Sequence, residues 1–289
     1  MSATLVANVV IAGVLTGLVY GLMALGLSVI FGVVRVVNFA HGELMTVAMY
    51  AATMLFAALK LDPFLCMLPA AAAFFAFGYA LQATLVNPFI TRPEHSQFML
   101  LVAVAIILSN ALLMAFGPDA RNVQVDYQLD TFEIGKLLVD KARLYGAAAA
   151  IAAASGLFLF FRKTRTGKAI RACADNHLGA RIAGLNVKHL YSLTFGLGAA
   201  CVAVAGCALV LLVDVTPPLG PYYTLLAFVI VIVGGLGSMG GALLGGVLIG
   251  VSEALAGLFI DPSAKSMFSF GLLILVLLFR PQGLLGRKA

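Results

Sequence analysis

The chain has 289 residues, of which 62% are hydrophobic and only 10% charged, and its mean hydropathy is +1.07. This apolar share is well above that of soluble domains and excludes an ordinary water-soluble fold. The formal charge of +6 does not predict nucleic-acid binding, because the Lys and Arg residues stand in short loops between apolar runs. Composition therefore predicts a protein that crosses the lipid bilayer many times.

A helix needs about 20 apolar residues to cross about 30 Å of hydrocarbon. Applied along the chain, this length predicts an all-α, polytopic membrane helix bundle, a single domain over residues 1–289, with about eight membrane segments. Ordinary spans are expected at 5–33, 38–59, 63–86, 97–117, 143–161, 189–213 and 266–279. No Lys or Arg precedes the first run, so it is interpreted as a spanning helix and not as a cleaved signal peptide.

The remaining apolar stretch, 223–258, is too long and too rich in glycine for one ordinary span. A helix would break most readily at its centre, which contains Gly235, Gly237 and Ser238. Irregular backbone at membrane depth is tolerated only where it is buried in protein or lines a wet cavity. We therefore predict a broken or re-entrant pair of short helices beside a solute pathway. Small residues four apart also predict close helix packing, in two ladders: Gly13, Gly17, Gly21 and Gly237, Gly241, Gly245.

The charges of the loops predict the orientation. Loop 162–188 is strongly basic and is expected in the cytoplasm, whereas loop 118–142 is acidic and is expected outside. Alternation then places Arg35 and Arg92 inside and the N-terminus outside. The basic residues after the last span place the C-terminus inside, namely Arg280, Arg287 and Lys288. Because loop 162–188 and the C-terminus are expected on the same side, the chain between them must cross the membrane an even number of times. The spans 189–213 and 266–279 supply two crossings, so the glycine-rich stretch must contribute no net crossing.

The sharpest polar cluster is Asn38, His41 and Glu43, at the start of the second span. Ionisable groups near the membrane interior indicate a functional site, because burying them is costly without partners. The alternative is an interfacial cap, with Asn38 as N-cap and Glu43 at the positive end of the helix. No second histidine stands at helical spacing, so neither a zinc site nor any other metal site is expected.

Three further polar residues fall within apolar runs: Ser109, Asn110 and Glu253. Each is expected to face the bundle interior and not lipid, either along a solute pathway or in hydrogen bonds between helices. The four cysteines form no CxxC pair and are interpreted as structural thiols. No nucleophile and base stand at motif spacing, so no catalytic residue is assigned.

The basic loop 162–188 is predicted to contain a capped helix, which positive charge that sets membrane orientation would not require. Residues 168–181 are rich in helix formers, Gly184 fits a C-terminal cap, and Asn186 fits the N-cap of the next span. This short cytoplasmic helix is either a handle for a soluble partner or a structural elbow. The chain lacks a GxxxxGK[ST] phosphate loop, so it is not expected to be an enzyme or to bind ATP or another cofactor itself.

These residues give the sequence a resemblance to the permeases of branched-chain amino acid ABC transporters, H-type subunit, over nearly the whole chain. The matching segments are NFAHGE (38–43), Arg92 with Pro93, RACADNHLGARIAGLN (171–186), GGLGSMGGALLGG (234–246) and FRPQGLLG (279–286). The resemblance implies a multi-pass protein of the bacterial cytoplasmic (inner) membrane. It also implies three kinds of partner: a homologous second permease, two cytoplasmic ATP-binding subunits, and an extracytoplasmic solute-binding protein.

By the same resemblance, Arg171 to Gly184 is the coupling helix that the ATPases engage. The residues assigned to that coupling are Arg171, Ala172, Asp175, Gly179, Arg181 and Gly184. Members of this family carry branched-chain and other hydrophobic amino acids, amides, urea or aromatic acids. A different reading of the residues is an ion-coupled secondary transporter of a small organic solute, with His41, Glu43 and Glu253 relaying protons.

Overall fold

The computed structural model describes residues 3–135, 137–261 and 265–286. Its long helices are α1 (Ala3–Val34), α2 (His41–Leu59), α3 (Pro63–Leu81), α4 (Glu94–Phe116), α5 (Lys141–Lys163), α8 (Val187–Leu209), α9 (Gly220–Gly234), α10 (Met239–Phe259) and α11 (Lys265–Phe279). The shorter elements are the π-turn η1 (Gln82–Val86), the 3-10 turns η2 (Asn87–Phe89) and η3 (Pro217–Leu219), the hairpin of β1 (Thr131–Ile134) and β2 (Leu137–Asp140), and the helices α6 (Arg165–Asp175) and α7 (His177–Ile182).

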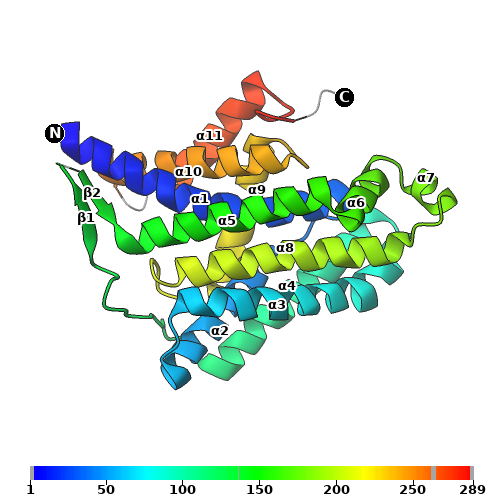
Figure 1. Cartoon of the computed structure of the whole chain (residues 1–289), viewed down its shortest axis with the longest axis horizontal. Helices are drawn as coiled ribbons and strands as arrows, with labels where there is room; N and C mark the ends of the chain where they lie inside the picture. The colour runs from blue at the N-terminus through cyan, green and yellow to red at the C-terminus, as the bar shows by residue number, and fades with distance from the viewer. Residues whose placement is uncertain (1–2, 136, 262–264, 287–289) are drawn as a thin grey trace.

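Helices α1, α3, α5, α8 and α10 lie along the long dimension of the molecule and α11 is steeply inclined to it, with the β-hairpin at one end and α6 and α7 at the other (Figure 1). Within the described residues, eight helices are long and apolar enough to cross a membrane, and α11 is a shorter apolar helix. This confirms a polytopic helical bundle with about eight membrane segments. The first predicted span is one unbroken helix, α1, which packs against α5, α8, α9 and α10.

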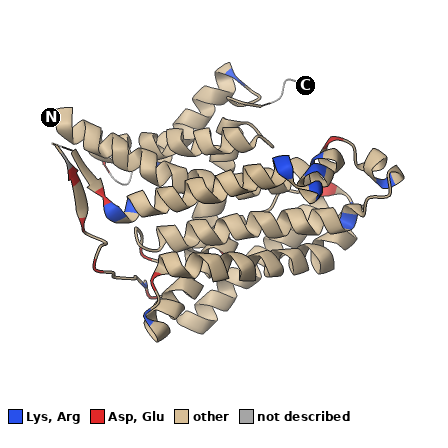
Figure 2. Cartoon of the chain, in the orientation of Figure 1, with Lys and Arg blue, Asp and Glu red and all other residues tan. Residues whose placement is uncertain are grey.

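Charged side chains gather at the two ends of the bundle (Figure 2). The basic end carries α6 and α7, and Arg35, Lys168 and Leu285 line one cavity there. At the acidic end, the Tyr127 hydroxyl donates a hydrogen bond of 2.5 Å to Asp62 Oδ2, at the start of α3. Burial, together with this bond to Asp62, raises the pKa of Tyr127. The acidic loop is therefore tied to the bundle through a protonated phenol.

The grouping of segments at the two ends agrees with the predicted alternation. Asn8 near the start of α1 accepts a hydrogen bond from the Leu138 amide of the acidic hairpin, whereas Leu284 near the C-terminus donates to Val233 at the basic end. Arg287 and Lys288 lie outside the described residues. Which side of the membrane each end faces stays a prediction.

The glycine-rich stretch forms two helices, as predicted, joined by a turn at residues 235–238. Gly235 and Gly237 have φ of 109° and 75°, in the region that favours glycine, and the Ser238 side chain caps α10. Helices α9 and α10 run antiparallel, because Gly234 packs against Gly241 and Ile230 against Gly245. The pair therefore makes no net crossing of the bundle. Only the expectation of short helices is wrong, because both α10 and α9 with η3 are long enough to cross.

Helix α10 packs through two different rows of glycine. Gly246 faces α1 so closely that a Cβ there would lie 2.4 Å from Gly21 Cα. Gly245 faces α9, where a Cβ would lie 2.5 Å from the Ile230 carbonyl oxygen. Glycine permits these backbone approaches, which give helices in lipid the contact area that the hydrophobic effect does not supply. The predicted ladders do mark close packing, but the row facing α1 is Gly246 and Gly250.

Candidate translocation site

The loop between α1 and α2 fixes the first group of polar side chains. Asn38 is fully buried, and its Oδ1 accepts a hydrogen bond of 3.1 Å from the Ala40 amide. The N-cap position of α2 is Ala40, which makes no side-chain cap bond. Asn38 therefore folds the loop just before the helix and is not the N-cap that the interfacial reading required.

His41 is a contact between helices. Its ring is fully buried, and Nε2 lies 2.9 Å from the Met23 carbonyl oxygen of α1, to which it donates. The other ring nitrogen, Nδ1, has no protein partner. A buried donor matched to a backbone carbonyl holds α2 against α1, so the structure gives His41 a positioning role.

Glu43 is held in a different way and faces a cavity. Thr224 on α9 donates from Oγ1 to Glu43 Oε2 at 3.0 Å, and Thr224 Oγ1 in turn accepts from the Gly42 amide at 2.9 Å. The absence of a side chain at Gly42 lets α2 approach α9, since a Cβ there would lie 2.4 Å from the Thr224 amide nitrogen. Thr224 thus places the carboxyl group of Glu43 at the wall of a cavity of about 410 Å³.

This cavity, named here the middle cavity, lies between α2, α4 and α9 and opens on the surface of the chain. Ser109 and Asn110 line it from α4. Asn110 is exposed and donates from Nδ2 to the Ile106 carbonyl oxygen of its own helix at 2.8 Å. The expectation that both residues face the bundle interior is therefore wrong for Asn110. Its apolar neighbours make α4 a membrane helix, but its polar side chain lies on the open face.

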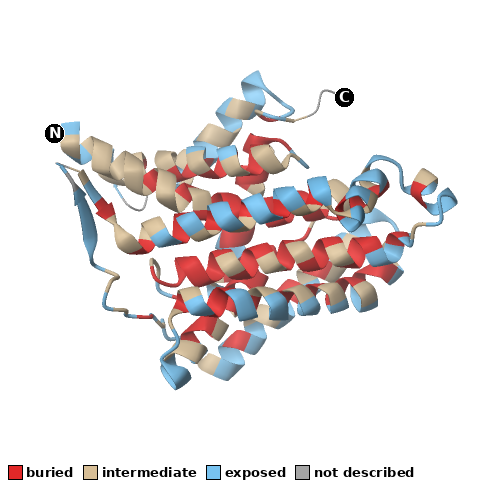
Figure 3. Cartoon of the chain, in the orientation of Figure 1, coloured by how far each residue is buried: buried red, intermediate tan, exposed pale blue. Residues whose placement is uncertain are grey.

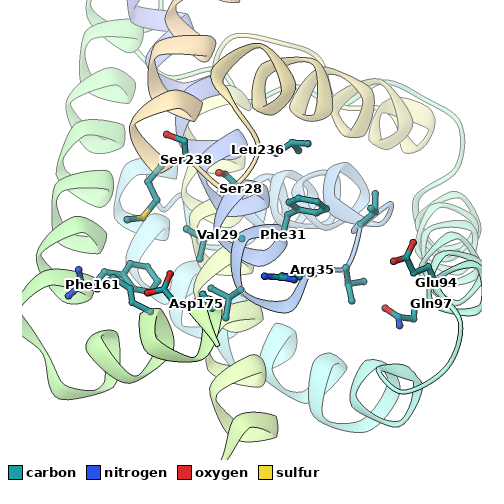
Figure 4. Close-up of a pocket in the computed structure, with 18 of the residues that line it drawn as sticks. Ser28, Val29, Phe31, Arg35, Glu94, Gln97, Phe161, Asp175, Leu236 and Ser238 are labelled. Carbon is teal, nitrogen blue, oxygen red and sulfur yellow. The ribbon is translucent and has the colours of Figure 1, made fainter. Parts of the chain in front are cut away.

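A larger cavity of about 1460 Å³, the inner cavity, occupies the basic end (Figure 4). Gly237 and Ser238 from the α9–α10 turn line it, as expected for irregular backbone beside a pathway. Gly235 does not; a Cβ there would lie 2.4 Å from the Gly286 amide nitrogen, so Gly235 packs against the C-terminal segment.

One aromatic side chain borders both cavities. Phe39 lines the middle cavity and the inner cavity. Its ring lies 4.7 Å from that of Phe98 on α4 and 5.1 Å from that of Phe228 on α9. Each ring comes from a different part of the chain, and together the three form an apolar cluster centred on Phe39, the residue that borders both cavities.

Glu253 lies in neither cavity. It is buried, accepts from the Ser269 hydroxyl of α11 at 2.8 Å, and is hydrogen-bonded to Tyr20 of α1. These contacts join α1, α10 and α11. Of the two readings that the sequence left open for Glu253, the contacts favour hydrogen bonding between helices.

The basic loop contains two helices where one was predicted over 168–181. Thr164 caps α6, and the chain breaks at Asn176, whose side chain accepts from the Gly179 amide and caps α7. An Asn side chain competes with the helical hydrogen bonds at such a position, which explains the break. Gly184 has φ of 80° and ends α7, and Asn186 caps α8, both as predicted.

The exposure of this loop differs from the expected small-residue face. Arg171, Ala172 and Asp175 on α6 are exposed, but Ala180 on α7 is buried. Gly179 is half-buried, and a Cβ there would lie 3.3 Å from the Asn176 amide group. The face that α7 presents is instead apolar and larger, with Leu178, Arg181 and Ile182 exposed.

The four cysteines are free and buried, in agreement with structural thiols. Burial raises the pKa of the Cys173 thiol in α6, which keeps it protonated and unreactive. Within the part of the chain that the structure describes, no three His, Cys, Asp or Glu residues come together as metal ligands.

Sequence reasoning assigned no site role to four residues that line the cavities, namely Arg35, Phe39, Phe98 and Thr224, nor to Phe228, which packs against Phe39. Thr224 had a usable signal, because it is the one Ser or Thr between Pro217 and Gly237. Phe39 stands within the segment 38–43 that the sequence singled out, whereas Phe98 and Phe228 had no signal, since aromatic residues are common throughout the chain.

Comparison with known proteins agrees with this arrangement. Residues 9–277 match the family model described as "Branched-chain amino acid transport system / permease component". The high-affinity branched-chain amino acid transport system permease protein BraD of Pseudomonas aeruginosa is 32% identical over 95% of this chain and 94% of its own length. LivH, a permease protein of the same description from Escherichia coli K12, is 31% identical over 95% of this chain and 94% of its own length.

A solved structure gives the same fold. PsaBC from Streptococcus pneumoniae, in complex with Fab, aligns with a TM-score of 0.50 and 15% identity, over 96% of this chain and 92% of that one.

Proposed function

Because this chain belongs to the family of branched-chain amino acid transport system permease components, and is therefore a multi-pass permease subunit of an ABC importer, we propose that it forms half of the pathway for branched-chain or related hydrophobic amino acids. A homologous second permease completes the pathway, partner ATPases drive it, and an extracytoplasmic protein delivers the solute. The membrane is the bacterial inner membrane, with the basic end and the C-terminus in the cytoplasm.

The observation that carries this proposal is the set of polar residues in the mostly apolar lining of the middle cavity. Glu43, Thr224 and Asn110 come from three helices and meet at a cavity that opens sideways out of the chain. Exposing each of these polar groups to lipid would cost free energy. A second permease over this face would convert the open cavity into a wet chamber between the two subunits.

The chamber continues toward the cytoplasm past the aromatic cluster. Phe39 borders both cavities, Phe98 lines the inner cavity, and Phe228 packs against Phe39. An apolar constriction between wet chambers acts as a gate by excluding water. We assign the cluster as the inner gate, which opens when α2, α4 and α9 separate.

The ATPases are proposed to bind the permease through α6 and α7. These helices project from the basic end (Figure 1), and α7 presents the exposed apolar side chains Leu178 and Ile182. Exposed apolar side chains rimmed by charge are typical of a docking surface. Replacing the exposed Ala172 by Trp is expected to abolish solute-stimulated ATP hydrolysis while the permease still inserts. Lys163→Trp, on exposed α5 surface outside these two helices, is the matched control.

The function is tested by reconstitution in vesicles with internal ATP. The permease pair with its ATPases and a leucine-loaded binding protein is expected to take up L-leucine, and uptake is expected to stop when ATP is withheld. The chain alone, under a proton gradient, is expected to take up none. Gradient-driven uptake by the chain alone would instead establish an ion-coupled secondary transporter.

A further inference from the structure

The inner cavity carries charges of both signs beside an apolar wall. Arg35, Lys168 and Arg171 line it together with Glu94 and Asp175. Figure 4 shows Arg35 at the centre, with Asp175 on one side and Glu94 on the other. Val29, Phe31 and Phe98 supply the apolar surface. A cavity with this combination matches a zwitterion that bears a hydrocarbon side chain better than it matches a simple anion.

Arg35 is held in the cavity by an unusual backbone. It is the residue directly after α1, its φ is 59°, and its amide donates to the Phe31 carbonyl oxygen at 3.0 Å. Helices commonly end with a residue in this left-handed conformation, but that residue is normally Gly or Asn, because a side chain costs free energy there. Lys60 has the same conformation at the end of α2, so what distinguishes Arg35 is that its cationic side chain lines the cavity.

Two features at the closed part of the cavity point to a ligand as well. Ser28 lines the cavity from α1, is fully buried, and its hydroxyl has no protein partner. Buried hydroxyl groups nearly always have a partner, so a polar group of a bound solute is a natural one. The first turn of α10 also lines the cavity through Ser238 and Met239. The positive end of that helix favours a carboxylate nearby.

We propose that the inner cavity is an exit-side binding site for the zwitterion of a small apolar amino acid, with Arg35 binding its carboxylate. This inference rests on the proposed function and adds to it a second position of the solute, below the gate. The solute leaves the middle cavity past Phe39, is held by Arg35 with its side chain against the apolar wall, and is then released to the cytoplasm.

The test places a reporter at the rim of the cavity. His95 is exposed and lines the cavity at the start of α4, and the natural cysteines are buried, so His95→Cys provides one reactive thiol. The permease pair with its ATPases is placed in nanodiscs of phosphatidylcholine, without binding protein, and alkylated with a charged thiol reagent. L-Leucine is expected to slow the alkylation, and L-leucinamide, which lacks the carboxylate, is expected not to.

The role of Arg35 is tested in the same reporter background. Arg35→Asn tolerates the left-handed backbone but removes the charge, and it is expected to raise the half-protecting leucine concentration about 10- to 100-fold, the loss typical of a charge-assisted hydrogen bond. Arg35→Lys keeps the charge and is expected to retain most of the protection. Arg92→Gln is the matched control, because Arg92 lies at the same end over the Phe89 ring and outside the cavity.

Three results would overturn the inference. One is protection by leucine that is the same in Arg35→Asn as in the parent; another is no protection at all. The third is protection by added phosphatidylglycerol and none by leucine, which would make the cavity a lipid headgroup site. Uptake of leucine by the complete importer, measured in parallel, separates the two proposals. Normal uptake without protection rejects the exit site alone, whereas no uptake of any branched-chain amino acid rejects the proposed function.

Discussion

Helices α1 and α4 are both strongly apolar, yet they occupy opposite environments. In the most apolar 18-residue stretch of α1, 83% of the residues are buried within the chain, against 22% in that of α4. Figure 3 colours the helices by burial. The difference follows glycine, since α1 carries five glycines and α4 carries none. In lipid, hydrophobicity alone does not drive a helix into the protein, whereas close backbone approach does.

The two helices also use their polar groups differently. On α1, Tyr20 and the Met23 carbonyl pair with Glu253 and His41 and lock neighbouring helices together. On α4, Ser109 and Asn110 line a cavity that opens away from the chain. The comparison assigns α1 to the rigid framework of the permease and α4 to the working face.

The largest loss of stability is expected at the contact between α1 and α10, where the helices leave no space for a side chain. In Gly246→Val, the new Cβ would meet the backbone of Gly21 on α1, which cannot move as a side chain can. We expect a loss of about 3 kcal/mol or more of folding free energy, read as a large fall in Tm of the detergent-solubilised permease. Gly156→Val on α5 is the control, because nothing lies within 4 Å of its Cβ position. Equal Tm values for the two variants would break the framework assignment.

A smaller loss of stability is expected at Glu253. Glu253→Leu leaves the buried hydroxyl groups of Tyr20 and Ser269 without their shared acceptor. We expect destabilisation of about 2 kcal/mol by thermal unfolding, because unsatisfied buried donors cost about 1–3 kcal/mol. A Tm equal to that of the parent, combined with lost uptake, would move Glu253 from the framework to the pathway.

At Glu43 we expect transport to change and stability to remain. Glu43→Gln keeps the shape and an acceptor for the Thr224 hydroxyl, but removes the charge from the middle cavity. Uptake by the reconstituted importer is expected to fall several-fold, with Tm and recovery of the assembled complex unchanged. Failure of the variant to assemble would show that Glu43 belongs to the framework.

The smallest change in stability is expected on α4 itself. Asn110 is exposed and its side chain donates a hydrogen bond within its own helix, to the Ile106 carbonyl oxygen, so Asn110→Leu should shift the folding free energy by less than about 0.5 kcal/mol. Uptake is nevertheless expected to fall, because an apolar side chain replaces a polar one on the cavity wall. A stable variant with unchanged uptake would remove Asn110 from the pathway.

The sequence was sufficient for features set by local chemistry. Span lengths follow from continuous apolar runs, the break at Gly235 to Ser238 follows from a local cluster of glycine, and the caps at Gly184 and Asn186 follow from residue type at one position. It was insufficient where a residue's role depends on which helix lies opposite. Glu43 and Glu253 look alike in sequence, but one faces a cavity and the other joins three helices.

The same limit applies to burial. Ala180 and Ala172 are equally small, yet only Ala172 is exposed, because α7 turns at Asn176 and presents a different face from the one that a continuous helix would present. Asn110 was expected inside because a polar residue avoids lipid. A polar residue also avoids lipid when it lies on a face that another subunit covers. The sequence of one chain does not distinguish this position from one inside the bundle.

The most direct test of the account is the reactivity of a thiol on α4 in the assembled importer. Asn110→Cys should react with a charged, water-soluble thiol reagent and be protected by transported leucine, whereas Ile274→Cys, exposed on apolar α11, should not react. That result would show that the α2–α4–α9 face lines a wet pathway. An unreactive Asn110→Cys in an active importer, equal to Ile274→Cys, would contradict it.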